Sequence, residues 1–185
     1  MNIMRKIIIS VLILLASFAG ANAQTLGIKT NLMEWAAFGT ANLGLELSAG
    51  NHVTIGINGA VNPWQWSGGR SSRGWGGELE VNHYFSYKYY GHHIGLFGHY
   101  ADYDLGMRKY NFDGKLYGGG ISYGYTFVLS DHLRLDLHVG AGYDRLDYDR
   151  NSVYTDPSDI VRYGHETKNW FGPNKAGLTF IYVIK

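Results

Sequence analysis

Apolar and polar side chains alternate along several segments of the chain, most regularly in LRLDLHVGAGY at residues 133–143. Leucine, valine, alanine and tyrosine occupy the odd positions, whereas charged residues, histidine and glycine occupy the even ones. Successive side chains of a β-strand point to opposite faces, so this period predicts a strand with one apolar and one polar face. The same alternation recurs in residues 42–49, 52–63, 76–86 and 115–129.

Turn-forming residues separate eight strand segments, with no helical periodicity of useful length and no second domain. The predicted strands are residues 27–36, 42–49, 52–63, 76–86, 92–106, 115–129, 133–148 and 174–184. Long loops are predicted after the third, fifth and seventh strands, at Trp64–Trp75, Met107–Gly114 and Asn151–Pro173. The other connections are short, including Ala37–Ala41, where a long loop would be expected. Short turns at one end and long loops at the other are typical of an outer-membrane β-barrel.

The alternation alone leaves two arrangements of the faces open. In a soluble, lipocalin-like barrel the apolar faces point inward, whereas in a membrane barrel they contact lipid. The run Gly118, Gly120, Ser122 and Gly124 favours the second arrangement, because large side chains in a narrow eight-stranded lumen must meet small ones. Tryptophan and tyrosine also gather near both strand ends, as at the two interfaces of a bilayer. We therefore expect an all-β, eight-stranded antiparallel up-and-down outer-membrane barrel with a filled polar lumen.

Charged side chains in such a lumen must be paired or hydrogen-bonded, because a buried and unmatched charge is strongly destabilising. The predicted lumen network consists of Lys29, Glu46, Glu78, Glu80, Arg134, Asp136 and His138. Acids outnumber bases in this set, so we expect either water in the lumen or a carboxylate held in its protonated form. The sequence leaves open which of these residues contact one another.

The N-terminus has the pattern of a secretory signal peptide. Two basic residues precede an apolar run, Ile7–Phe18, and a small-x-small cleavage site follows. The run is shorter than the roughly 20 residues that a membrane-spanning helix requires. We predict a signal peptide over residues 1–23, cleavage between Ala23 and Gln24, and one barrel domain over residues 24–185 in the outer membrane.

Composition narrows the possible partners. The chain has no cysteine, so we expect neither a lipoprotein nor disulfide bonds. The formal net charge is +1, and removal of the two basic residues of the signal peptide makes it −1, which gives no indication of nucleic-acid binding. The 26 glycines and 15 tyrosines favour β-structure over helix.

The last predicted strand carries a pattern that resembles the C-terminal assembly signal of outer-membrane barrels. Lys175, Gly177, Phe180 and Tyr182 match polar-x-Gly-x-x-apolar-x-apolar close to the chain end. Phe180 and Tyr182 share one face of the strand, where they would contact lipid or the barrel-insertion machinery. We expect both as partners.

Motifs for metal or cofactor binding are weak, and we expect neither a metal nor a cofactor. His92, His93 and His99 have no standard metal-site spacing, and His165-Glu166 lacks the second histidine of a zinc-protease helix. The glycines at 118–120 lie within a strand, unlike those of a phosphate-binding loop. A charged cluster, interpreted as a solvated barrel rim with a calcium or partner site as the alternative, consists of Asp144, Arg145, Asp147, Asp149 and Arg150.

Hydrolytic activity has candidate residues without a recognisable nucleophile. Barrels of this size include enzymes that act on lipid-A acyl chains, and a Ser-His-acid set would be required. Ser122 or Ser130 could combine with His132 or His138, but Ser122 and His138 lie on predicted lumen faces. We therefore assign no catalytic residue and do not expect an enzyme.

Five stretches, in order, resemble one protein family: KTNLMEWAAFGTANLGLE, VNPW, LYGGGISYGYTFVLS, GAGYDRLDYDR and NWFGPNKAGLTFIYVIK. The family consists of exported Bacteroidota proteins described as a domain of unknown function, and its genes often lie near those for fimbrial subunits and anchors. The resemblance covers nearly the whole mature chain. It implies a small envelope β-barrel with a link to fimbriae, and it implies no catalytic residue.

The sequence thus predicts a monomeric barrel with a structural role. The barrel would anchor the chain in lipid and display Trp64–Trp75 and Asn151–Pro173 to another surface component, which the resemblance implies is fimbrial. The alternatives are a lipid-modifying outer-membrane enzyme and a soluble periplasmic lipocalin-like carrier.

Overall fold

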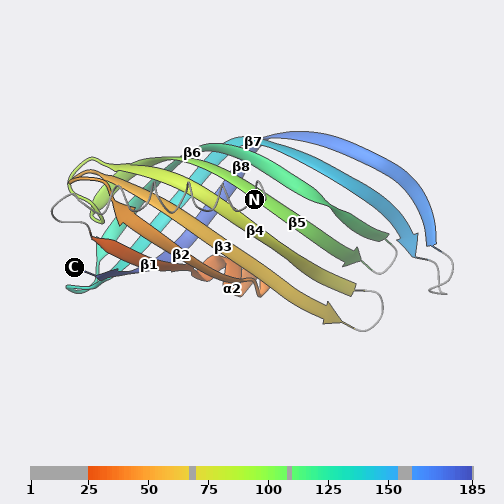
Figure 1. Ribbon diagram of the computed structural model, residues 1–185, viewed down its shortest axis with the longest axis horizontal. Coiled ribbons are helices and arrows are strands. Elements are labelled where there is room, and N and C mark those ends of the chain that lie inside the picture. The colour runs from red at the N-terminus through yellow and green to blue at the C-terminus, as the bar shows by residue number, and fades with distance from the viewer. Residues whose placement is uncertain (1–24, 67–69, 108–109, 154–159, 185) are drawn as a thin grey trace, which may run out of the picture.

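The computed structural model of the protein describes residues 25–66, 70–107, 110–153 and 160–184, which form a closed barrel of eight antiparallel strands with one short helix (Figure 1). The strands are β1 (Leu26–Asn31), β2 (Ala41–Ser48), β3 (Val53–Trp66), β4 (Arg70–Tyr84), β5 (Gly91–Met107), β6 (Tyr110–Val128), β7 (Leu133–Val153) and β8 (Ile160–Ile184). Each strand pairs with the next, and β1 closes the ring against β8. The predicted all-β, eight-stranded up-and-down barrel is confirmed. The predicted signal peptide and its cleavage site lie outside the described residues.

Polar side chains face the inside of the barrel and apolar side chains face outward. Glu46, Thr54 and Thr126 are polar, face inward and are at most 1 % exposed. By contrast, Leu96 on β5 and its cross-strand partner Ile121 on β6 face outward and are 64 % and 70 % exposed. Of the two arrangements that the alternation left open, the structure has the polar lumen.

A short helix, α2 (Leu32–Phe38), follows β1, where the sequence predicts that the first strand continues to residue 36. Asn31 ends the strand and caps the helix, because its side-chain oxygen accepts a hydrogen bond from the backbone N–H of Met33 at 3.0 Å. Gly39 ends the helix with φ of 60°, a left-handed conformation that glycine adopts without strain. The strand prediction was wrong here because a helix this short shows no readable periodicity. Within the described ranges, no helix is long and apolar enough to cross a membrane.

The predicted long loops are largely paired strand, so that prediction was also wrong. Asn62 pairs with Gly74, and the pairing continues to Trp66 and Arg70. The β5–β6 and β7–β8 ladders likewise extend beyond the predicted strand ends. Three hairpins therefore project from one end of the barrel, with β7 and β8 the longest strands, while the wall is low at β1 and β2 (Figure 1).

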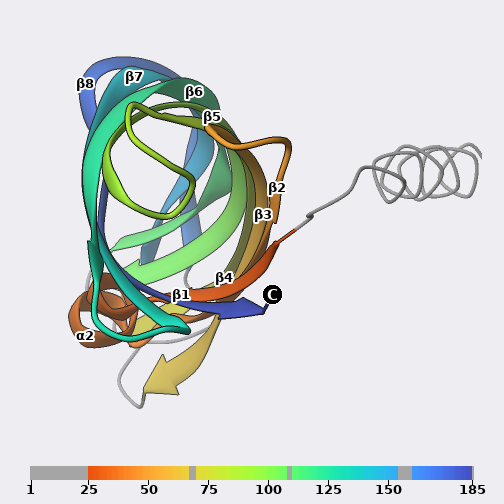
Figure 2. The same ribbon diagram turned by 90° about the vertical axis from the view of Figure 1, so that its left-hand side faces the viewer.

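Side chains close the opposite end of the barrel, where the short turns lie. Tyr84, Tyr89, Ile181 and Val183 are each at most 2 % exposed. Tyr89 belongs to the β4–β5 turn, and its hydroxyl donates to the backbone carbonyl of Glu46 at 2.7 Å. Figure 2 shows this yellow-green turn lying across the near end of the ring. These residues form the floor of the lumen.

Candidate functional site

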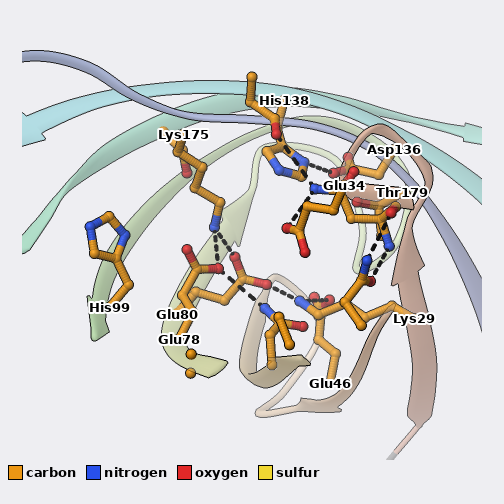
Figure 3. Close-up of a pocket in the computed structure, with 18 of the residues that line it drawn as sticks. Lys29, Glu34, Glu46, Glu78, Glu80, His99, Asp136, His138, Lys175 and Thr179 are labelled. Atoms are coloured by element: carbon orange, nitrogen blue, oxygen red, sulfur yellow. Dashed lines mark hydrogen bonds and ion pairs between the residues drawn. The ribbon is translucent and has the colours of Figure 1, made fainter. Parts of the chain in front are cut away.

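Five charged side chains form a continuous network across the lumen (Figure 3). Lys29 on β1 has its Nζ 3.2 Å from Oε2 of Glu46 on β2, and it also contacts Glu80 on β4. Lys175 on β8 has its Nζ 2.7 Å from Glu78 and 2.5 Å from Glu80. Glu80 therefore bridges both lysines, and three carboxylates share two ammonium groups.

Small residues and amide groups accommodate this network. A Cβ on Gly56 would lie 2.9 Å from Nζ of Lys29 and 3.0 Å from Glu80, so glycine leaves the space that the ion pair occupies. The side-chain amide of Asn58 donates to Oε1 of Glu78 at 3.1 Å. Each carboxylate of the network thus has an ammonium partner, and Glu78 has an amide donor as well.

A second cluster of polar side chains surrounds Asp136 of β7. His93 on β5 has its Nε2 2.7 Å from Oδ1 of Asp136, and His138 has its Nδ1 2.7 Å from Oδ2. The hydroxyl of Thr126 on β6 donates to Oδ1 at 2.8 Å. A Cβ on Gly124 would approach Nε2 of His93 to 2.5 Å, so this small residue makes room for an imidazole.

Asp144 lies in the lumen, with a third histidine. His99 has its Nε2 2.9 Å from Oδ1 of Asp144, and the amide of Asn174 donates to the same oxygen at 2.9 Å. The side chain of Asp144 is buried. The interpretation of residues 144–150 as a solvated rim was therefore wrong for Asp144, whereas Asp149 is exposed on the β7–β8 hairpin.

Most of the predicted lumen residues line one cavity. They are Lys29, Glu46, Glu78, Glu80, Asp136 and His138. Arg134 is not brought to them, because its guanidinium donates to the backbone carbonyls of Ser130 and Leu133 at the short-turn end. Arg134 pairs across the sheet with Ile181, whose side chain helps to fill the floor.

The sequence interpretation did not assign Lys175, His93, His99 or Asp144 to the lumen network. In the assembly pattern Lys175 counts only as a polar position, although it shares an alternating face with Gly177 and Thr179. That shared face was the available signal for an inward side chain. Within the same pattern, Gly177 is buried, whereas Phe180 and Tyr182 are on the opposite face and Tyr182 is exposed.

A cavity of about 320 Å³ lies between these polar groups and α2. Glu34 reaches it from the helix, and Figure 3 shows its carboxylate turned toward Glu78 and Glu80. Burial raises the pKa of Glu34. A hydrogen bond from Nδ2 of Asn31 to Oε1 of Glu34, at 3.0 Å, lowers this pKa, and the negative charge of the nearby Glu78 raises it further. The cavity therefore holds a carboxylate in an environment that disfavours its charge.

The other residues considered for metal binding or hydrolysis lie on both faces of the barrel wall. His92 is exposed on the outer face, whereas its neighbour His93 faces the lumen. Ser122 and His138 line the same cavity from neighbouring strands, but His138 is hydrogen-bonded to Asp136 and no hydrogen bond joins it to Ser122 among the described contacts. In the part of the chain that the structure describes, no group of three or more His, Cys, Asp or Glu residues could hold a metal ion.

The fold and the site define a small β-barrel whose interior is a hydrogen-bonded polar network with a cavity. The chain belongs to the family described as "Protein of unknown function (DUF3575)", whose model matches residues 8–184. Comparisons with curated proteins and with solved structures found no match. The family agrees with the resemblance to a domain of unknown function noted in the sequence.

Proposed function

We propose that the protein is a monomeric, integral β-barrel of the outer membrane that serves as an anchor. The observation that carries this proposal is the band of exposed aliphatic side chains around the barrel. Its members are Leu43, Leu45, Ile57, Val61, Leu79, Val81, Ile94, Leu96, Ile121, Leu137 and Val139. A large apolar surface favours association in water but suits the hydrocarbon region of a bilayer.

Aromatic residues border this band on both sides, which supports the same proposal. Toward the short turns they are Phe85, Tyr87, Tyr90, Tyr123, Phe127 and Tyr182, and toward the hairpins they are Trp64, Trp75, Tyr100, Tyr117, Tyr143 and Trp170. Such rings favour the headgroup level of a bilayer. On β7 the outward positions from Leu133 to Tyr143 cover about the 9–11 residues that a tilted transmembrane strand requires.

The lumen supports anchoring over transport of an apolar ligand. A lipocalin-like carrier would need an apolar interior, whereas Lys29, Glu46, Glu80 and Asp136 are buried inside this barrel. Tyr84 and Tyr89 close one end of the lumen. A polar lumen with a closed floor suits an anchor better than a pore.

The hairpins supply a surface for interaction with another surface component. The segments Trp64–Trp75 and Asn151–Pro173, of which the structure describes parts, belong to hairpins that project from one end of the barrel (Figure 1). Phe171 on the β7–β8 hairpin is 84 % exposed. The resemblance to a family with fimbria-associated genes makes a fimbrial subunit or anchor the partner that we propose.

Cell fractionation with heat-modifiable gel mobility tests the membrane location. We expect the protein in the outer-membrane fraction, with a compact band that shifts only after heating. Recovery of the protein from the periplasm without detergent, with an apolar ligand inside the barrel, would contradict the proposal.

Shortening the longest hairpin tests the partner. Tyr148 and Glu166 pair across β7 and β8, so a two-residue turn can join them in place of residues 149–165. We expect the shortened barrel to insert normally while assembly of the fimbrial component at the surface falls. The matched control shortens the β5–β6 hairpin at the pair Asp104 and Asp113. Unchanged assembly would remove the fimbrial role and leave the membrane proposal standing.

A further inference from the structure

The lumen cavity is large enough to hold a small organic molecule. Its volume of about 320 Å³ is at the lower end of the range of about 300–1,000 Å³ that is typical of small-molecule sites. Its lining runs from Tyr84 and Ile181 at the floor to Ala101 and Leu116 on the tall side of the barrel, with Glu34 of α2 at the low side.

Carboxylates outnumber lysines around the cavity. Lys29 and Lys175 are both engaged by the three carboxylates of the network, whereas Glu34 has the neutral amide of Asn31 as its hydrogen-bond donor. Glu78 has a side chain that is 18 % exposed, the most accessible carboxylate of the network. Like charges that face one another in a partly buried site favour either protonation or a bound cation.

An imidazole at the floor also requires a hydrogen-bond donor. His93 is 3 % exposed and lines the cavity, and its Nδ1 has no hydrogen-bond partner among the described residues. Nε2 faces the carboxylate of Asp136 at 2.7 Å, so in the neutral form of the ring the proton is on Nε2. In that form Nδ1 is a lone-pair acceptor, and a buried acceptor without a donor is destabilising.

Part of the remaining wall is formed by small or apolar residues, among polar ones such as Asn42 and Asn82. It includes Ala60, Gly76, Gly77, Ala101 and Leu116. A short alkyl chain fits such a wall, whereas a metal ion would need a cluster of ligands that the described residues do not form. The carboxylates, the imidazole acceptor and this wall thus call for the same chemistry, a positive group with N–H donors on a short carbon chain.

We propose that the lumen cavity binds a small alkyl amine or diamine, with one ammonium group between Glu34 and Glu78 and further N–H donors directed toward the floor near His93. The ammonium group adds a cation beside the carboxylates of Glu34 and Glu78, and the carbon chain contacts Ala60 and Ala101. The inference concerns the lumen alone and does not depend on which membrane holds the barrel.

Calorimetric titration of the full chain, folded in detergent micelles, with putrescine tests this proposal. We expect saturable binding of one putrescine per barrel, and no binding of 1,4-butanediol, which has the same length without charge. The Glu34→Gln variant should weaken putrescine binding about tenfold or more, because a charge-assisted hydrogen bond becomes a neutral one. Glu166→Gln, which changes an exposed carboxylate on the β7–β8 hairpin, should bind as the parent does.

Ala60→Leu provides a second route, because it fills part of the cavity without changing any charge. The Ala60→Leu variant should not bind putrescine, and its heat-modifiable mobility should confirm that the barrel has folded. If Glu34→Gln fails to fold, Glu78→Gln takes its place. The proposal would be overturned by butanediol binding as tightly as putrescine, by unchanged affinity in the cavity variants, or by the absence of saturation at about 10 mM putrescine. Equal competition by Mg²⁺ would also overturn it, since that would indicate nonspecific attraction to negative charge.

Discussion

Asp136, Leu137 and His138 are consecutive residues of β7, yet their side chains lie in opposite environments. Asp136 and His138 face the lumen and are hydrogen-bonded to one another, whereas Leu137 faces outward and is 45 % exposed. An inward side chain depends on particular partners from other strands and on glycines that leave it room. In the proposed bilayer location, an outward side chain needs only to be apolar. The inner face is therefore specific at each position, and the outer face is specific only in its average character.

Removing a cation from the inner face should have the largest effect. Lys29→Met should lower the free energy of unfolding by about 3–5 kcal/mol, because Glu46 and Glu80 would remain buried with less compensating charge. Urea unfolding of the barrel in detergent, followed by tryptophan fluorescence, measures the change. Lys168→Met, on the exposed part of β8, is the control and should stay within about 0.5 kcal/mol of the parent. Equal losses in both variants would mean that the lumen network is not a stabilising unit.

Placing a charge on the outer face should have the next largest effect. Leu137→Arg should cost about 2–4 kcal/mol in a bilayer, because the proposed location puts the new guanidinium in the hydrocarbon region. Refolding into lipid vesicles, measured by heat-modifiable mobility, reports the loss. Leu105→Arg makes the same change further along β5 than Tyr100, toward the hairpin end, and should cost no more than about 1 kcal/mol. If both variants insert equally well, lipid does not surround the aliphatic band.

Replacing a glycine by valine should also distinguish the inner face from the outer face, with a smaller change in the free energy of unfolding. In Gly124→Val the new Cβ would meet Nε2 of His93 at 2.5 Å, so overpacking should cost about 1–3 kcal/mol. Gly59→Val faces outward, where a Cβ meets nothing within 4 Å, and should be neutral or slightly stabilising. The same unfolding measurement serves both variants. A Gly124→Val barrel as stable as Gly59→Val would show that the inner glycines are not needed for space.

The contrast between the faces also explains what the sequence could predict. Alternation identified the strands wherever one face is apolar and the other polar, as at residues 133–143. It failed at Asn62–Trp66 and Arg70–Gly74, where the paired strands form a hairpin beyond the barrel wall and polar residues occur on both faces. Strand pairing there depends on continuing a ladder that begins lower down, which a local pattern does not report.

The lumen residues could be predicted as a set, but their contacts could not. Lys29 and Glu80 belong to strands that are not neighbours in the ring, so their contact depends on how the barrel closes and on its lumen width. Arg134 satisfied the same alternation but lies level with the filled floor, so it bonds to turn carbonyls instead. The sequence alone does not specify the height of that floor.

The smallest effect concerns Glu34, which belongs to neither face because α2 carries it to the cavity. Its pKa is raised in the folded barrel, chiefly by burial, so the folded state binds a proton more tightly there than the unfolded chain does. This contribution to stability is complete below the unfolded pKa near 4.5 and is lost as the pH rises through the raised value. Glu34→Gln should therefore be more stable than the parent at pH 8, with a difference that shrinks as the pH falls toward 4.5. Unfolding curves across that range measure the difference, and a gap that grows on acidification would mean that a cation already compensates Glu34 in the empty barrel.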